Sequence, residues 1–115
     1  MTVTFTREIT WTQACPLDRM TTGLGVRVLM DNGEHAALFM LGDGDFRAIG
    51  DIDPFSHASV LSRGIVGDHG GELMVASPLK KQAFSLDTGK CLDDPSVSVP
   101  TYDVRVVAGI VELGR

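Results

Sequence analysis

Residues 53–100 read DPFSHASVLSRGIVGDHGGELMVASPLKKQAFSLDTGKCLDDPSVSVP, and this stretch decides the fold. It contains two short segments in which proline is the second residue, Asp53-Pro54-Phe55 and Ser77-Pro78-Leu79-Lys80. Leu-Ser-x-Gly at 61–64, a glycine-rich turn and a β-rich run at 73–76 lie between them. A Phe-x-Leu-x-Thr-Gly run at 84–89 follows. The order is therefore a first loop, a turn-rich connection, a strand, a second loop and a further strand.

The rest of the chain shows short alternating or β-rich runs bounded by turn residues, with little helical periodicity. Strands are predicted at 26–30, 36–41, 46–49, 73–76, 84–86, 102–107 and 110–113. Asn32-Gly33 favours a tight hairpin turn, and Ala108-Gly109 can turn the strand at 102–107 back on itself. A short helical turn is expected just before Pro16. Composition and pattern alone therefore predict an all-β domain, a small sandwich or barrel.

Bulk properties exclude several classes of function. A chain of 115 residues is expected to form one domain, residues 1–115. Its net charge of -5 makes nucleic acid a poor partner, because phosphate binding depends on Lys and Arg. No apolar run approaches the ~20 residues of a membrane span, and the first residues lack the pattern of a secretory signal. A cytoplasmic protein with free thiols at Cys15 and Cys91 is expected.

The order of motifs from Asp53 onward resembles the Rieske iron–sulfur family. The positions that fall in step with that family are Leu61, Ser62, Gly64, Gly67, Pro78, Phe84, Leu86, Thr88, Gly89 and Pro100. Within the family the chain looks most like the small subunits of assimilatory NAD(P)H-dependent nitrite reductases, which share the DPFS, VLSRGIVGD, ASPLKKQ-F and TG-CLDDP runs. The resemblance is close in the second half of the chain, whereas the first half matches only by strand pattern.

This resemblance implies a Rieske-like fold of antiparallel sheets or a β sandwich, into which residues 50–90 insert a two-loop subdomain of the cluster-binding type. A Rieske centre needs two cysteines and two histidines. At the matching positions this chain has Asp53, Phe55, Ser77 and Lys80 instead. Phenylalanine has no lone pair, and a protonated lysine has none free. We therefore expect no cluster, no other metal, and no cofactor in this chain.

Side chains at the loops can replace the mechanical role of a cluster. Asp53 can meet either Lys80 or Ser77 in a charge-assisted hydrogen bond that holds the loops together, or these residues can be ordinary solvated loop residues. His57 and His69 are expected to be exposed loop residues. Cys15 and Cys91 are expected to be small buried apolar residues.

Signals for a self-sufficient enzyme are weak. The sequence contains neither a G-x-G-x-x-G fingerprint nor a phosphate-binding G-x-x-x-x-G-K-[ST] loop. No serine lies in G-x-S-x-G. The pair Asp93-Asp94 precedes a proline and is typical of a turn. No catalytic residue is therefore predicted.

The resemblance implies an accessory subunit of an enzyme that reduces nitrite to ammonium. Its partner would be a large subunit that carries FAD, an iron–sulfur cluster and sirohaem. The loop tips offer a docking patch, for which the candidate residues are Pro54, Phe55, Arg63, Leu79, Lys80 and Lys81. Two alternatives stay open: a free Rieske-type ferredoxin that carries electrons, and a stand-alone ligand-binding β domain.

Overall fold

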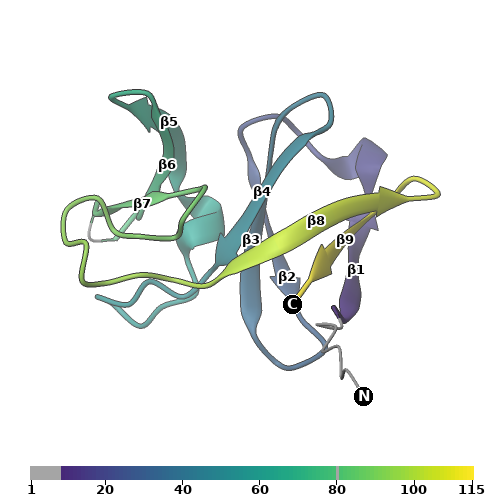
Figure 1. Cartoon of the computed structure of the whole chain (residues 1–115), viewed down its shortest axis with the longest axis horizontal. Helices are drawn as coiled ribbons and strands as arrows, with labels where there is room; N and C mark the ends of the chain where they lie inside the picture. The colour runs from purple at the N-terminus through teal and green to yellow at the C-terminus, as the bar shows by residue number, and fades with distance from the viewer. Residues whose placement is uncertain (1–8, 80) are drawn as a thin grey trace, which may run out of the picture.

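The computed structural model describes residues 9–79 and 81–115, in which strands dominate (Figure 1). The strands are β1 (Trp11–Pro16), β2 (Gly25–Leu29), β3 (His35–Gly42), β4 (Asp45–Gly50), β5 (Ile65–His69), β6 (Glu72–Ala76), β7 (Ala83–Ser85), β8 (Thr101–Val107) and β9 (Ile110–Gly114). Two single-turn 3-10 helices accompany them, η1 (Leu17–Arg19) and η2 (Leu61–Arg63). No helix of the described residues is long and apolar enough to cross a membrane.

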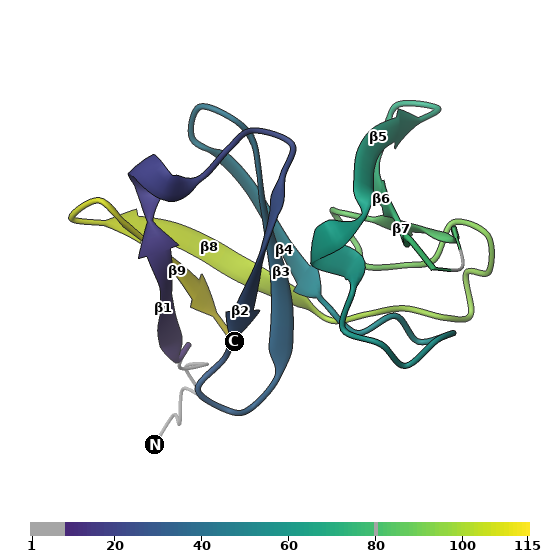
Figure 2. The same cartoon turned by 180° about the vertical axis from the view of Figure 1, so that it is seen from behind.

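Six strands form one antiparallel sheet in the order β1-β9-β8-β4-β3-β2. The sheet curls until its two edge strands approach each other, and the amide of Asp31 beyond β2 donates to Thr12 Oγ1 in β1 at 3.2 Å. Figures 1 and 2 show the resulting barrel-like body from both sides. The backbones of Thr10 and Arg115 exchange two hydrogen bonds of 3.2 Å, so the start of β1 lies beside the end of the chain.

Residues 36–41 of strand β3 pack on both faces, which explains their unbroken apolar sequence AALFML. Successive side chains of a strand point to opposite faces. Ala36 and Leu38 pack in the interior of the six-stranded body, whereas Ala37 and Phe39 pack against the second core on its outer side. β3 therefore lies between the two hydrophobic cores and contributes side chains to both.

The second core joins the large sheet to a small three-stranded sheet in the order β5-β6-β7. Its buried members are Ala37, Phe39, Ile49, Leu61, Val75, Phe84, Leu86, Cys91 and Val99. Gly25 in β2 permits η2 to lie directly on the large sheet, because a Cβ there would come within 2.2 Å of the Ser62 carbonyl oxygen. The small sheet and its loops thus form a lobe at one end of the molecule, away from the β8–β9 turn (Figures 1 and 2).

The strand predictions agree closely with these elements, and two expectations are wrong. Trp11–Pro16 is strand β1 rather than the approach to a helical turn, because it pairs with β9 through Trp11↔Gly114 and Pro16↔Ile110. Residues 65–69, expected in a glycine-rich turn, form strand β5, and the turn is confined to Gly70-Gly71. His69 therefore ends a strand, although it is exposed as expected.

Candidate functional site

Three turns of the small lobe share one pattern of backbone hydrogen bonds among their described residues. They span 53–58, 77–82 and 85–90, and we call them the first, second and third turn. In each, the first residue's amide donates to the carbonyl of the sixth, at 2.8, 2.9 and 2.8 Å. The fifth residue's amide donates back to the carbonyl of the first, at 2.7, 2.9 and 2.9 Å. The fifth residue has positive φ in every case: 63° at His57, 63° at Lys81 and 77° at Gly89.

The first residue of each turn also caps its own loop with its side chain. The amide two positions ahead donates to Asp53 Oδ1 at 2.8 Å, to Ser77 Oγ at 3.4 Å and to Ser85 Oγ at 3.2 Å. Asp and Ser are the residues that make such local bonds. All three are buried, with at most 1% of their surface exposed. Each turn is therefore built on an interior polar side chain.

Asp53 and Ser77 join the first two turns directly. The Ser77 hydroxyl donates to Asp53 Oδ2 at 2.5 Å. Burial raises the pKa of the Asp53 carboxyl, but hydrogen bonds from Ser77, Phe55 and Ser56 outweigh it, and the net pKa is lowered. The expected loop contact is confirmed in its Asp53–Ser77 form. Lys80, the other partner considered for Asp53, lies outside the described residues.

Asp51 anchors the start of the first loop, a role that sequence reasoning missed. Its side chain is fully buried and accepts hydrogen bonds of 2.5 Å from the Ser59 hydroxyl and from the Ser62 amide. Its carbonyl accepts from Val60 and Leu61. The sequence signal that could have indicated this role is an aspartate directly after a buried strand. An aspartate at such a position is equally typical of an exposed turn, so the signal does not distinguish the two.

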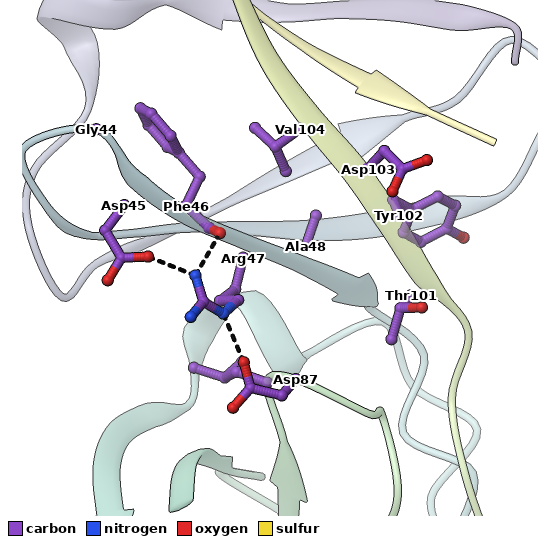
Figure 3. A pocket seen from close by; sticks show the side chains of 11 residues that line it. Gly44, Asp45, Phe46, Arg47, Ala48, Asp87, Thr101, Tyr102, Asp103 and Val104 are labelled. Atoms are coloured by element: carbon purple, nitrogen blue, oxygen red, sulfur yellow. Dashed lines mark hydrogen bonds and ion pairs between the residues drawn. The ribbon is translucent and has the colours of Figure 1, made fainter.

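Arg47 of β4 ties the large sheet to the third turn. Its Nε donates to Asp87 Oδ1 at 2.7 Å, and its Nη1 contacts Asp45 and the Phe46 carbonyl. These charges lie beside a groove of about 380 Å³ between β4, β8 and the third turn (Figure 3). The hydrogen bond that Arg47 donates to the Asp87 carboxylate, followed by the one that it donates to Asp45, raises the pKa of Arg47 despite partial burial. Arg47 therefore links β4 of the large sheet to the third turn of the small lobe.

The predicted docking residues lie on the first two turns and on η2. Leu79 is 55% exposed, and Arg63, Lys81 and Pro78 are also exposed, while Pro54 is half-buried. Phe55, an apolar candidate of the docking patch, is not a freely exposed loop tip. It packs on the second core with its ring 6.3 Å from that of Phe84, and it is half-buried. Lys80 cannot be placed, because it lies outside the described residues.

The residues at the family's ligand positions do not fit a Rieske cluster. Asp53 and Ser77 use their oxygens to bond each other and their own turns. Phe55 presents a hydrocarbon ring where an imidazole nitrogen is required. Within 9–79 and 81–115, no three His, Cys, Asp or Glu side chains are grouped to hold a metal ion. No chemical step is therefore derived through a cluster in this chain.

The remaining candidate residues have structural roles. Cys91 is fully buried and free, as predicted, whereas Cys15 is half-buried with its Sγ 3.4 Å from Met20 Sδ. Burial outweighs the nearby Arg19 and raises the pKa of the Cys15 thiol. The Asp93–Asp94 pair holds loops: Asp93 accepts from the Ala83 amide and Asp94 from Ser96.

The antiparallel body with its small lobe and paired loops defines a Rieske-like β domain, and residues 10–114 match the family model described as a Rieske-like [2Fe-2S] domain. A nitrite reductase (NADH) small subunit of Salmonella typhimurium is 49% identical over 104 residues, which cover 90% of this chain and 95% of that protein. The chain therefore belongs to the nitrite reductase small-subunit family of Rieske-like domains.

Two solved structures and one longer relative extend this comparison. A protein described as the NADH-dependent nitrite reductase small subunit of Mycobacterium tuberculosis has a TM-score of 0.90 and 55% identity, over 95% of this chain and 97% of that one. A carbazole 1,9a-dioxygenase ferredoxin from Nocardioides aromaticivorans has a TM-score of 0.76 and 26% identity, over 90% and 96%. The nitrite reductase [NAD(P)H] large subunit of Klebsiella oxytoca is 40% identical over 108 residues, which cover 91% of this chain but 11% of that protein.

Proposed function

We propose that the chain is the small subunit of an NAD(P)H-dependent nitrite reductase, which binds and supports a large subunit in the cytoplasm without catalysing a step itself. The large subunit supplies the FAD, iron–sulfur cluster and sirohaem that transfer electrons to nitrite, with ammonium as the product. This chain supplies a rigid β domain whose paired turns contact that partner. Residues 50–90 act as the partner-facing subdomain of a single domain, 1–115.

The observation that carries this proposal is the match inside a large subunit. In the Klebsiella oxytoca protein, a segment equivalent to 91% of this chain is part of the same polypeptide as the rest of the large subunit. A domain that is covalently attached in one relative and separate in another is expected to occupy the same place in both assemblies. The adjacent ends of β1 and β9 suit such attachment, because the connecting chain would enter and leave at one point.

The chemistry of the turns supports a role without a cluster. The Asp53–Ser77 hydrogen bond already connects the two loops that a Rieske cluster would bridge, and it leaves no soft donor set at their tips. Electron transfer by this chain as a free ferredoxin is disfavoured for that reason, although the fold resembles a ferredoxin. A stand-alone ligand-binding role lacks a convergent set of polar groups at the same position.

Docking is proposed to use the loop-tip surface, which we define as Pro54, Phe55, Arg63, Leu79, Lys80 and Lys81. Leu79 is its most exposed apolar side chain among those described, and Arg63 and Lys81 provide positive charge on an acidic protein. Arg and large apolar residues are enriched at interface centres. Phe55 contributes mainly by anchoring the first turn to the second core, since its ring packs there.

The test is affinity purification of the tagged chain from its native cytosol, with mass spectrometry and an optical spectrum of the eluate. Co-elution of a large polypeptide with flavin and sirohaem absorption supports the proposal. Iron and acid-labile sulfide bound stoichiometrically to the isolated chain would support the ferredoxin function instead. Leu79→Asp should abolish binding of the partner, whereas Leu29→Asp, a matched control at an exposed position of β2, should preserve it.

A further inference from the structure

The first and second turns place side chains at a backbone position that favours glycine. The third turn has Gly89 at its fifth position, with φ of 77°. The first and second turns have His57 and Lys81 there, each with φ of 63°. A non-glycine residue at positive φ is strained, because its Cβ crowds the neighbouring carbonyl oxygen. The first and second turns therefore carry backbone strain at the fifth position, and the third turn, with glycine there, does not.

Strained positions persist where the side chain contributes something that glycine cannot. His57 and Lys81 are both exposed. Among the described contacts, neither side chain donates or accepts a hydrogen bond, and the four ion pairs involve Arg47, Arg105 and Arg115 instead. No described polar contact therefore explains why a side chain replaces glycine at these two positions.

The two positions are equivalent places in two turns that are joined to each other. The Asp53–Ser77 hydrogen bond joins the first residues of the two turns, and each fifth residue is bonded back to that first residue through its amide. The backbone thus places His57 and Lys81 at equivalent points of a paired structure. Lys81, Arg63 and Lys90 are exposed cations of this lobe, on a chain whose net charge is -5 with histidine neutral.

We propose that His57 and Lys81 are recognition residues for an acidic patch on the large subunit, held in strained backbone so that both side chains project from the paired turns. This inference rests on the proposed function and names the chemistry of the surface that the partner presents. The positive charge of Lys81 and Arg63 on an acidic protein also orients the approach of the partner and suppresses contacts through its other faces.

The test is a titration of each variant into the purified large subunit, with the melting temperature measured in parallel. His57→Gly with Lys81→Gly removes both side chains and relieves the strain. This double variant should bind about tenfold or more weakly, while its melting temperature equals or exceeds that of the unmodified chain. Lys81→Glu retains the strained backbone and should weaken binding as well, and the affinity of the unmodified chain should fall with added salt.

Ala108→Gly is the matched control. Ala108 is also exposed with positive φ, 51°, but it lies in the β8–β9 turn, away from the small lobe (Figures 1 and 2). Its replacement should relieve strain without changing affinity. Binding of the double glycine variant within about twofold of the unmodified chain would overturn the inference, as would a lowered melting temperature. If the unmodified chain itself fails to bind, the proposed function fails first, so the two failures are distinguishable.

Discussion

The Ser77 hydroxyl donates a 2.5 Å hydrogen bond to Asp53 Oδ2, and this contact joins two loops whose first residues are 24 positions apart. Both side chains are buried, and both also cap their own turns. This buried polar pair therefore connects the two loops directly.

Replacing Ser77 with alanine should destabilise the domain by about 1–3 kcal/mol, because it leaves the buried Asp53 carboxylate short of a donor. Urea denaturation measures the change in the free energy of unfolding. Ser96→Ala is the matched control: its hydroxyl also bonds an aspartate, Asp94, at 2.6 Å, but on the exposed surface. A loss at Ser77 no larger than at Ser96 would contradict the role assigned to the buried pair.

The same carboxylate predicts a dependence of stability on pH. The folded-state pKa of Asp53 is lowered from its ordinary value of 3.8, so the folded state favours the ionised form. The resulting stability is fully present above pH 3.8 and is lost as pH falls through the lower folded pKa. The stability difference between the unmodified chain and Asp53→Asn should therefore shrink on acidification. A difference that is constant down to acid unfolding would show that ionisation of Asp53 contributes nothing.

Tyr102 should resist ionisation while the protein is folded. Burial, followed by its 2.5 Å hydrogen bond to Glu34 and the charge of that residue, raises its pKa above the ordinary value of 10.0. This stabilisation is present below pH 10.0 and is lost as pH rises through the folded pKa. Tyr102 is the chain's one tyrosine, so phenolate absorbance reports it directly. Half-ionisation of the folded protein near pH 10.0 would contradict this environment.

The Arg47–Asp87 contact should orient the small lobe more than it stabilises the fold. Its side chains are 30% and 49% exposed, so solvent screening limits a double-mutant coupling energy to about 0.2–1 kcal/mol. That coupling should diminish in about 1 M salt. Arg47→Ala should also accelerate amide exchange in the third turn. Unaltered exchange there would indicate that the second core alone positions the lobe.

Close packing between the lobe and the large sheet depends on Gly25. Gly25→Ala would bring a methyl group within 2.2 Å of the Ser62 carbonyl oxygen, and relief of that clash should cost about 1–3 kcal/mol. Gly42→Ala is the control, because a Cβ at Gly42 has no neighbour within 4 Å among the described atoms. Equal melting temperatures for the two variants would show that η2 moves away from β2 without loss.

Local sequence patterns predicted most of the strands, because the alternation of apolar and polar residues and the turn residues that bound a strand are both visible within a few positions. The stretch at 102–107 and the Asn32-Gly33 turn are examples. Trp11–Pro16 was misassigned because its pairing with β9 is set by residues about a hundred positions away, which no local pattern records. Strand β5 was missed because Gly67 weakens its β signal.

The candidate site was predictable only where the resemblance supplied a frame. That frame brought Asp53 and Ser77 together in advance, but it could not choose between Ser77 and Lys80 as the partner of Asp53. The Arg47–Asp87 contact links residues 40 positions apart and depends on how two sheets pack. The equivalence of the three turns was also hidden, since their sequences share only an initial Asp or Ser.

The most direct test of the account is a sedimentation titration of the purified chain, with its iron and acid-labile sulfide measured, against the purified large subunit. The chain should form a saturable complex with the large subunit while it is free of iron and sulfide. The double variant His57→Gly, Lys81→Gly should weaken that complex. A complex that forms only with a chain carrying stoichiometric iron and sulfide would contradict the central claim.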